Sequence, residues 1–356
     1  MSLASHATAE GTARYRERFA GRAAPHHFRV RERLHLSSIG IGTYLGNADE
    51  ATDTRYKDAV VRAVQLGVNV IDSAANYRFQ RSERSIGEAL KVLTSEHGFS
   101  REEIVICTKG GYLPFDGAPP RDPGKYIYDT FIKPGVVSFE DFVAGSHCMA
   151  PAYLEHQLEQ SLRNLGVGAV DVYYIHNPES QLAYVTDAEF HHRLQSAFER
   201  LEQNRSDGKL SYYGVATWNG FRTSEDASDH HSLARMVELA RQVGGADNGF
   251  RFIQLPLNLA MPEAIAVAEE ANDLGVTVVA SASILQARLA HNLPEQLRTA
   301  LGQIRTDAQA AIQFVRSAPG ITTALVGMSR VEHVEQNLEL VQVEPLDERG
   351  FAQLFS

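Results

Sequence analysis

The feature that most constrains the fold is a regular alternation of short runs rich in β-branched residues with longer helical stretches. Candidate strands occupy residues 38–42, 68–72, 104–108, 170–175, 211–216, 252–255, 276–280 and 322–326. Helical stretches occupy residues 55–66, 83–93, 152–165, 190–203, 233–242, 262–274, 307–317 and 332–340. Strands that alternate with helices form a parallel sheet, and about eight such units close into a barrel. The sequence therefore predicts an α/β protein with a (β/α)8 TIM barrel.

The N-terminal end lies outside this alternation. Residues 1–25 are small, polar and charged, and we expect them to form a flexible tail or a short helix. Residues 27–31 and 34–36 alternate apolar and polar side chains in the manner of a β-hairpin. No linker divides the rest of the chain, so we expect residues 26–356 to form a single barrel domain.

Two long segments interrupt the short connections that are typical of a barrel, residues 110–150 and 281–304. Loops longer than about 15 residues in a compact domain are usually functional or disordered. Aromatic residues in the first segment favour a packed loop. Because both segments follow strands, they should lie on the catalytic face of the barrel. We predict that the first segment supplies aromatic walls to a substrate pocket.

Charge and composition disfavour several classes of protein. The formal net charge of -10 disfavours a nucleic-acid partner, which would need a basic face. No apolar run approaches the roughly 18 residues that a membrane helix needs, and the first residues lack the apolar core of a secretory signal. We expect a cytoplasmic protein. The two cysteines, Cys107 and Cys148, do not form a Cys-x-x-Cys pair, and there is no His-Glu-x-x-His, so we expect no metal site.

Reactive side chains occur where successive strands end. Asp72, Lys109 and His176 follow the second, third and fourth predicted strands, and Tyr77 comes five residues after Asp72. In a barrel these strand ends meet at one rim, where active sites form. Each residue alone is common in a turn, a core or a solvated loop, but chance rarely places all of them on successive strand ends. We therefore expect the four side chains to form a catalytic site.

Together these residues make a proton donor for the reduction of a carbonyl group. Tyrosine has a pKa near about 10, which is high for proton transfer at neutral pH. We expect the Lys109 ammonium to lower the pKa of Tyr77 by roughly three units, and Asp72 to keep Lys109 charged. His176 would donate a hydrogen bond to the substrate oxygen and orient it.

Three segments around these residues resemble the aldo/keto reductase family. They are GVNVIDSAANYRFQRSERSIGEAL, which contains Asp72 and Tyr77, VICTK, which ends at Lys109, and DVYYIHNPE, which contains His176. The resemblance runs from about residue 29 to residue 337. It implies reversible hydride transfer between a nicotinamide cofactor and an aldehyde, ketone or alcohol, with the four residues in the catalytic roles.

The resemblance also implies contacts with the nicotinamide half of the cofactor. These residues are Gly42, Thr43, Tyr44, Asp72, Thr217, Trp218, Asn219, Gln254 and Ser281. Where the family usually has Ser-Asn-Phe, this chain has Ala216, Thr217 and Trp218, and Asn219 could compensate for the hydrogen bond that Ala216 cannot make. Ser281 occupies the place of an aromatic residue that stacks on the nicotinamide, and Trp218 could provide a different wall.

The segment after the last strand, LVGMSRVEHVEQNLEL, resembles the family's adenosine-phosphate site. It implies contacts from Gly327, Met328, Ser329, Arg330, His333, Gln336 and Asn337. The backbone N–H groups at a helix start attract an anion. Because Arg330 and Ser329 lie where a 2′-phosphate would bind, we predict a preference for NADP(H), with NAD(H) as a possible second cofactor.

Two other functions stay open at this point. A regulatory subunit with the same fold could keep cofactor binding as a sensor without catalysis, and a barrel isomerase or lyase could share only the fold. The intact set of four residues favours the enzyme. We expect a small-molecule carbonyl or alcohol as the partner, and a monomer or a homodimer.

Overall fold

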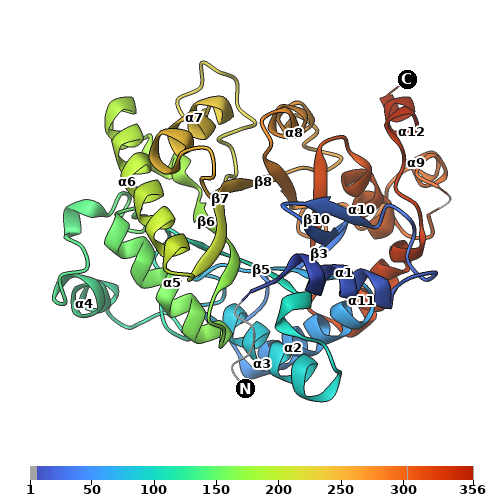
Figure 1. Ribbon diagram of the computed structural model, residues 1–356, viewed down its shortest axis with the longest axis horizontal. Coiled ribbons are helices and arrows are strands. Elements are labelled where there is room, and N and C mark those ends of the chain that lie inside the picture. The colour runs from blue at the N-terminus through green and yellow to red at the C-terminus, as the bar shows by residue number, and fades with distance from the viewer. Residues whose placement is uncertain (1–5, 303, 356) are drawn as a thin grey trace.

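The computed structural model describes residues 6–302 and 304–355, which contain a closed barrel of parallel strands (Figure 1). The strand order around the barrel is β10-β3-β4-β5-β6-β7-β8-β9. Their bounds are β3 (Ile39–Gly42), β4 (Val70–Asp72), β5 (Val105–Gly110), β6 (Val170–His176), β7 (Leu210–Ala216), β8 (Phe250–Pro256), β9 (Thr277–Ser281) and β10 (Ile321–Gly327). Each overlaps one predicted strand, so the predicted barrel is confirmed.

Helices cover the outside of this barrel, as the sequence predicts. The helices that overlap predicted ones are α2 (Glu50–Gln65), α3 (Arg81–Glu96), α5 (Pro151–Leu165), α6 (Asp187–Ser206), α7 (Leu233–Gly244), α8 (Ala264–Asp273), α10 (Asp307–Ser317) and α11 (Val331–Leu338). Further α-helices are α1 (Ala9–Arg18), α4 (Pro123–Ile127), α9 (Glu295–Ala300) and α12 (Glu348–Ala352). Single turns occur at η1 (Arg101–Glu103), η2 (Tyr128–Ile132), η3 (Phe139–Asp141), η4 (Pro178–Gln181), η5 (Glu339–Gln342) and η6 (Gln353–Phe355).

Alternate residues along each strand face the two sides of the barrel wall. Val70, Val105 and Cys107 pack with one another in the interior, whereas Ile71 and Ile106 pack in the cluster formed with the surrounding helices. Side chains on successive strand residues point to opposite faces, and in a closed barrel one face is the interior. Because apolar residues fill both faces, the strands read as continuous hydrophobic runs in the sequence.

The predicted hairpin is present. Strands β1 (Phe28–Arg31) and β2 (Leu34–Ser37) pair antiparallel. Leu34 and Leu36 are buried in the same cluster as the interior residues of the barrel, so the hairpin closes the end of the barrel opposite the strand C-termini.

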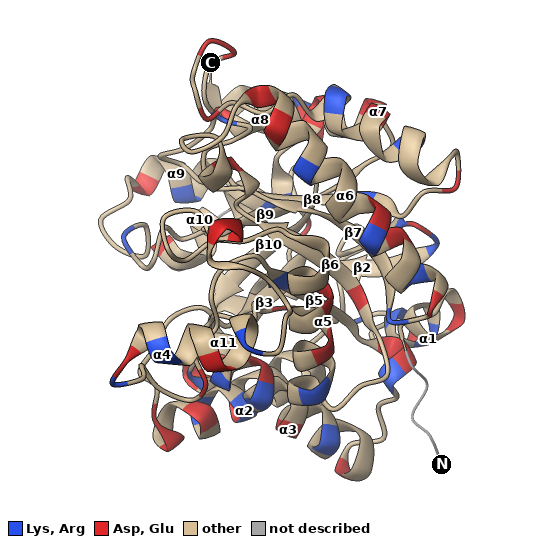
Figure 2. Cartoon of the chain, turned by 90° about the vertical axis from the view of Figure 1, so that its left-hand side faces the viewer, with Lys and Arg blue, Asp and Glu red and all other residues tan. Residues whose placement is uncertain are grey.

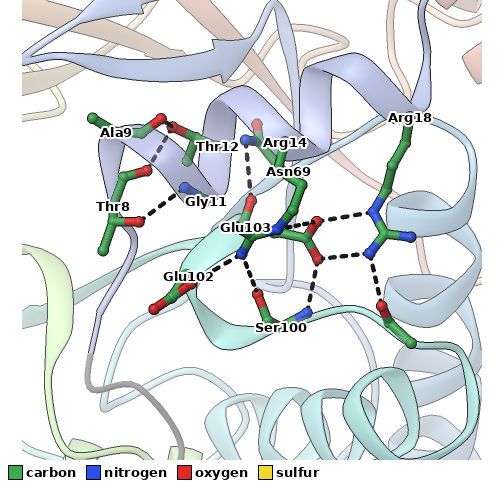
Figure 3. Close-up of polar contacts among 11 residues, drawn as sticks. Thr8, Ala9, Gly11, Thr12, Arg14, Arg18, Asn69, Ser100, Glu102 and Glu103 are labelled. Carbon is green, nitrogen blue, oxygen red and sulfur yellow. Dashed lines mark hydrogen bonds and ion pairs between the residues drawn. The ribbon is translucent and has the colours of Figure 1, made fainter.

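Of the flexible tail or short helix that we expected for residues 1–25, the structure shows the short helix, α1, and residues 1–5 lie outside the described residues. Helix α1 contacts β2 and η1. Its Tyr15 is fully buried, and the phenol donates a hydrogen bond to the carbonyl of Val64 at 2.6 Å. Figure 3 shows how the helix is held: the Thr8 hydroxyl accepts from the N–H of Gly11, and Arg18 pairs with Glu103 at 2.8 Å. The segment is polar enough to resemble a tail because one face of the helix is solvated.

Figure 2 shows Lys, Arg, Asp and Glu interspersed over the outer helices and loops, whereas the strands are mostly uncharged. Among the described helices, none is both long enough and apolar enough to cross a membrane.

Candidate active site

The structure brings the four predicted catalytic residues together at one end of the barrel. Asp72 is the last residue of β4, Lys109 is the fifth residue of β5, and His176 is the last residue of β6. These strands are neighbours, with Asp72 in register with Cys107 and Lys109 with Tyr174. Tyr77 follows in the loop between β4 and α3. The ends of parallel strands meet at one rim, which is why residues 104 positions apart along the chain share a site.

Lys109 and Asp72 form a buried ion pair beneath this rim. The Lys109 Nζ lies 2.6 Å from Asp72 Oδ2 and donates to the Ser73 carbonyl at 2.8 Å. The two side chains are 1% and 5% exposed, so water contributes little to their solvation. Burial by itself lowers the pKa of Lys109, but the attraction of Asp72 and Tyr77 raises the pKa above its usual value. Lys109 therefore carries its charge at neutral pH, as we expected.

The Tyr77 hydroxyl lies 3.4 Å from the Lys109 Nζ. Our expectation that Lys109 lowers the pKa of Tyr77 to near neutrality is wrong. Burial of the phenol, the largest effect, raises its pKa above the usual value; Lys109 opposes this and Asp72 adds to it. Because Asp72 largely neutralises the ammonium, the phenol meets an ion pair rather than a free positive charge. Tyr77 is therefore protonated at neutral pH, which is the form that can donate a proton.

The backbone that follows Tyr77 is unusual. Arg78, Phe79 and Gln80 all have positive φ, at 49°, 58° and 71°. Consecutive non-glycine residues in the left-handed region cost about 1–3 kcal/mol each and persist only where surrounding contacts hold them. The Arg78 guanidinium donates to the Asn47 carbonyl at 2.9 Å and pairs with Asp53, which fixes this loop.

His176 faces Tyr77 across the site. Its ring centroid lies 5.8 Å from that of Tyr77 and 5.0 Å from that of Tyr112, edge to face in both cases. Burial lowers the pKa of His176 well below its usual value, and Lys109 and His147 lower it further. The imidazole is therefore neutral, and its Nδ1 has no hydrogen-bond partner among the described residues. A neutral imidazole has one N–H to donate, which suits the expected contact with a substrate oxygen.

A cavity of about 510 Å³ opens at these side chains. Among the residues predicted from the sequence, its lining contains Gly42, Thr43, Tyr44, Asp72, Tyr77, His176, Thr217, Trp218, Gln254, Ser281 and Gly327. Lys109 lies behind Asp72 and Tyr77 and does not reach the cavity. The other predicted cofactor residues, Asn219, Met328, Ser329, Arg330, His333, Gln336 and Asn337, lie outside the lining.

The sequence analysis did not single out several residues that line the cavity. They are Leu45, Asn76, Asn177, Ala282, Ser283, Ile284, Gln286, Ala287 and Leu325. Asn177 adjoins a catalytic residue, and residues 282–287 belong to the second long segment, so position alone could have found them. The first long segment contributes Tyr112 to the lining. Its other aromatic residues do not reach the cavity, because Tyr126 and Phe131 pack with Tyr153 in a separate small core.

One wall of the cavity links the ion pair to strands β7 and β8. The Gln254 side-chain Nε2 donates to Asp72 Oδ1 at 2.8 Å, and the Gln254 carbonyl accepts from the N–H of Thr217 at the same distance. The Thr217 hydroxyl is buried and has no partner among the described residues. Trp218 is 39% exposed, and its backbone N–H donates to Glu179 at 2.6 Å. This wall thus presents a buried hydroxyl beside an aromatic side chain.

The cavity lining reaches Gly327, four residues before the first residue of α11. Gly327 ends β10, and a Cβ built there would meet nothing within 4 Å, so the backbone is open to a ligand. Arg330 precedes the first residue of α11 and is exposed, and no ion pair is formed by it within the described chain. On the same helix His333 is exposed, while Asn337 is buried with its side-chain oxygen unpartnered among the described residues.

Comparisons with known proteins agree with this architecture. Among curated proteins, the chain is 24% identical over 359 aligned positions to a Schizosaccharomyces pombe protein provisionally named as a voltage-gated potassium channel subunit beta, covering 91% of this chain and 90% of that protein. It is 24% identical to the L-glyceraldehyde 3-phosphate reductase of Escherichia coli O157:H7, covering 86% and 84%. The crystal structure of an aldo/keto reductase from Klebsiella pneumoniae in complex with NADP and acetate matches with a TM-score of 0.64 at 20% identity, covering 93% and 94% of the two chains.

The model of the aldo/keto reductase family matches residues 38–284, which include all four residues of the rim. That match covers more than half of the chain, and the closed barrel carries the arrangement that the sequence motifs predict. The chain belongs to the aldo/keto reductase family.

Proposed function

We propose that this protein is an NADP(H)-dependent oxidoreductase that transfers hydride reversibly between its cofactor and an aldehyde, ketone or alcohol. The observation that carries the proposal is the contact of the Tyr77 hydroxyl with the Lys109 Nζ, at 3.4 Å, opposite His176 on the wall of one cavity. Such a pair of groups can give a proton to a carbonyl oxygen and hold that oxygen in place.

The residues present fit a nicotinamide dinucleotide. Its carboxamide needs hydrogen-bonding groups, and the unpartnered Thr217 hydroxyl and the Gln254 side chain supply them in the cavity wall. Its phosphates need N–H groups and positive charge, which Gly327, Arg330 and the start of α11 offer. The Asn337 side-chain oxygen, which has no partner among the described residues, would be available to accept a hydrogen bond from the adenine.

With a reduced nicotinamide held by Thr217 and Gln254, the cofactor would supply a hydride for the carbonyl carbon and would itself become oxidised. Tyr77 transfers its phenolic proton to the carbonyl oxygen, so that the C=O bond becomes a C–H and an O–H bond. Lys109 stabilises the tyrosinate that remains until solvent returns the proton. His176 donates a hydrogen bond to the same oxygen and fixes its direction. In the reverse reaction the tyrosinate accepts the proton of the alcohol.

The side chains around the substrate end favour an uncharged carbonyl compound. Tyr44, Leu45, Tyr112 and Trp218 provide apolar and aromatic surface, and Asn76 and Asn177 provide neutral polar groups. Within the described lining the one charged side chain is Asp72, which is neutralised by Lys109. A phosphate or carboxylate would lose hydration here without gaining a cation. We therefore propose aromatic or aliphatic aldehydes and ketones as substrates, unlike the phosphorylated compound named for the Escherichia coli relative.

The preference for NADP(H) is part of the proposal. Arg330 is exposed at the start of α11, is free of an ion pair in the described chain, and lies next to Ser329. An arginine contact with the 2′-phosphate is worth roughly 1.5–3 kcal/mol, which favours NADP over NAD without excluding NAD. The neighbour from Klebsiella pneumoniae is a complex with NADP, which supports this choice.

A steady-state assay with a set of aldehydes tests the proposal. Trp218 is the one tryptophan of the sequence and lines the cavity, so its fluorescence reports cofactor binding. We expect quenching by NADPH, turnover of benzaldehyde and butanal, and little turnover of glyceraldehyde 3-phosphate. Faster turnover of the phosphorylated aldehyde would contradict the substrate class.

A regulatory subunit is the second candidate, favoured by the name of the Schizosaccharomyces pombe relative. Such a protein would bind NADPH, with quenching of Trp218, and would convert none of the aldehydes. An isomerase or a lyase would show neither signal. The same two measurements therefore separate the three functions.

A further inference from the structure

The long segment at residues 110–150 contains one buried histidine that the proposed reaction does not use. His147 is 1% exposed, and its Nε2 lies 2.8 Å from the backbone carbonyl oxygen of His176. The ring of Tyr112 stands edge to face against both histidines, with centroids 5.0 Å from each. Although the segment gives the cavity wall little besides Tyr112, it is in direct contact with a residue of the proposed catalytic set.

The surrounding side chains decide which nitrogen of His147 carries the proton. Arg193 on α6 donates from Nη1 to Gln181 Oε1 at 2.9 Å. Because a guanidinium has donors only, the amide of Gln181 must present its oxygen to Arg193 and its nitrogen to His147. That nitrogen lies 2.8 Å from His147 Nδ1, which therefore accepts. The proton of the neutral imidazole must then be on Nε2, which donates to the His176 carbonyl.

His147 is neutral under ordinary conditions. Burial lowers its pKa to about 4, and the hydrogen bond to the His176 carbonyl opposes the shift only in part. The charged group that reaches it through Gln181 is Arg193, which is itself paired with Glu189. The described side chains in ring contact with it, or bonded to it, are otherwise the uncharged Tyr112 and Gln181. The direction of the hydrogen bond is therefore constant across neutral pH.

The His147 contact meets the backbone where strand β6 ends, beside the hydrogen bond that the N–H of Asn177 donates to the carbonyl of Ala216. Asn177 has a φ of 47°, so the chain enters the left-handed region directly after the strand. The His176 ring holds its place by ring contacts, since its Nδ1 has no partner among the described residues. The approach of His147 is close enough that a Cβ on Gly111 would lie 3.0 Å from the His147 Nε2 and 3.2 Å from the His176 carbonyl oxygen. Gly111, with a φ of 136°, makes room for the contact.

We propose that His147 is a positioning residue for His176: its Nε2–H, oriented by Gln181 and Arg193, holds the His176 carbonyl so that the His176 imidazole faces the reacting carbonyl oxygen. This assignment rests on the proposed oxidoreductase function. It gives the segment at residues 110–150 a role in catalysis that does not require contact with substrate.

Two variants separate the hydrogen bond from the packing of the ring. His147→Phe keeps an aromatic ring against Tyr112 and removes the N–H donor, whereas His147→Gln keeps an N–H donor and removes the ring. Misplacement of a group by about 1 Å costs up to roughly 100-fold in rate, so we expect kcat to fall at least about 10-fold in His147→Phe. In His147→Gln we expect kcat to stay within about threefold of the wild type. The Kd for NADPH, from Trp218 fluorescence, should be unchanged in both.

His156→Phe is the matched control. His156 lies on α5, packs its ring 5.4 Å from Phe131 of the same segment, and makes no contact with the four rim residues. Its kcat should equal that of the wild type. Equal losses of kcat in His147→Phe and His147→Gln would assign the effect to packing and overturn the proposal, as would unchanged kcat in His147→Phe.

A second measurement does not depend on turnover. In protein labelled with 15N-histidine, the ring resonances of His176 should shift in His147→Phe and stay near the wild-type position in His147→Gln. If the wild type converts no carbonyl compound, the proposed function fails while these shifts still test the role of His147. Unchanged His176 resonances in His147→Phe would refute that role in either case.

Discussion

At the scale of single residues, Tyr77 is the group on which the chemistry of the cavity depends. Its phenol is next to a charged lysine and is protonated at neutral pH. Tyr77→Phe removes the proton and leaves the ring, so fold and NADPH affinity should be retained. Loss of a general acid costs about 100-fold or more in turnover. The control variant is Tyr174→Phe, which removes the hydroxyl of a buried tyrosine of β6 that does not line the cavity. Near-wild-type kcat in Tyr77→Phe would end the assignment.

The raised pKa of Tyr77 predicts the pH dependence of carbonyl reduction. The active form is the protonated phenol, which is present below the folded-state pKa and lost as the pH rises through it. Because burial, the largest effect, raises that pKa above about 10, kcat should be level from neutral pH to about pH 10 and fall only beyond it. A pH–rate profile of the wild type, with a pH-stability control, checks this. A basic limb between pH 7 and 9 would show that Lys109 dominates the phenol after all.

The comparison of sequence and structure is most informative at this scale. The positions of Asp72, Tyr77, Lys109 and His176 follow from the order of strands, because strand ends meet at one rim. The pKa of Tyr77 does not follow, because it depends on how deeply the phenol is buried and on how tightly Asp72 holds Lys109. Spacing along the chain measures neither quantity. The neutral residues of the lining, such as Asn76, carried no chemical signal that distinguishes them from ordinary loop residues.

At the scale of elements, the start of helix α11 is the part of the site where cofactor choice is decided. Arg330 precedes α11, whose N-terminus adds a partial positive charge. In Arg330→Ala we expect the Kd for NADPH to rise about 10- to 150-fold, with the Kd for NADH nearly unchanged. Fluorescence titration of Trp218 with both cofactors measures this. Equal affinities of the wild type for the two cofactors would contradict the prediction and place Arg330 in solvent.

The two long segments show what pattern alone can and cannot predict about an element. Their position after strands correctly puts them at the rim, but the aromatic side chains of the first segment pack in two different places. Tyr112 reaches the cavity, while Phe131 and Tyr126 build a small core against Tyr153 of α5. Both destinations bury aromatic surface, so composition cannot separate them. Only the packing of α5 against the segment decides which ring faces which side.

At the scale of the whole molecule, the barrel is the part of the structure that the sequence predicts best. Each strand is a short apolar run, and each helical stretch repeats its apolar residues with the period of an α-helix. The alternation of the two leaves few alternatives to a closed parallel sheet. The N-terminal segment could not be predicted in this way. Helix α1 buries one large side chain, Tyr15, and Phe19 at its C-cap is also buried, so the amphipathic pattern of the helix is weak although these anchors are deep in the core.

Those anchors make residues 6–25 part of the cooperative unit. The Tyr15 ring packs 5.1 Å from Phe19, 5.9 Å from Phe28 and 6.0 Å from Phe99, in the same core cluster as the helices around the barrel. Removal of a buried large aromatic side chain costs about 3–5 kcal/mol. Tyr15→Ala should therefore lower the free energy of unfolding by about that amount, measured from urea unfolding curves.

Tyr15→Phe removes only the hydrogen bond to the Val64 carbonyl and should cost about 1–3 kcal/mol. Lys91→Ala, at an exposed ion pair with Glu88 on α3, should cost about 0–1 kcal/mol. If Tyr15→Ala unfolded at the same urea concentration as the wild type, α1 would be an appendage that can detach without disturbing the barrel.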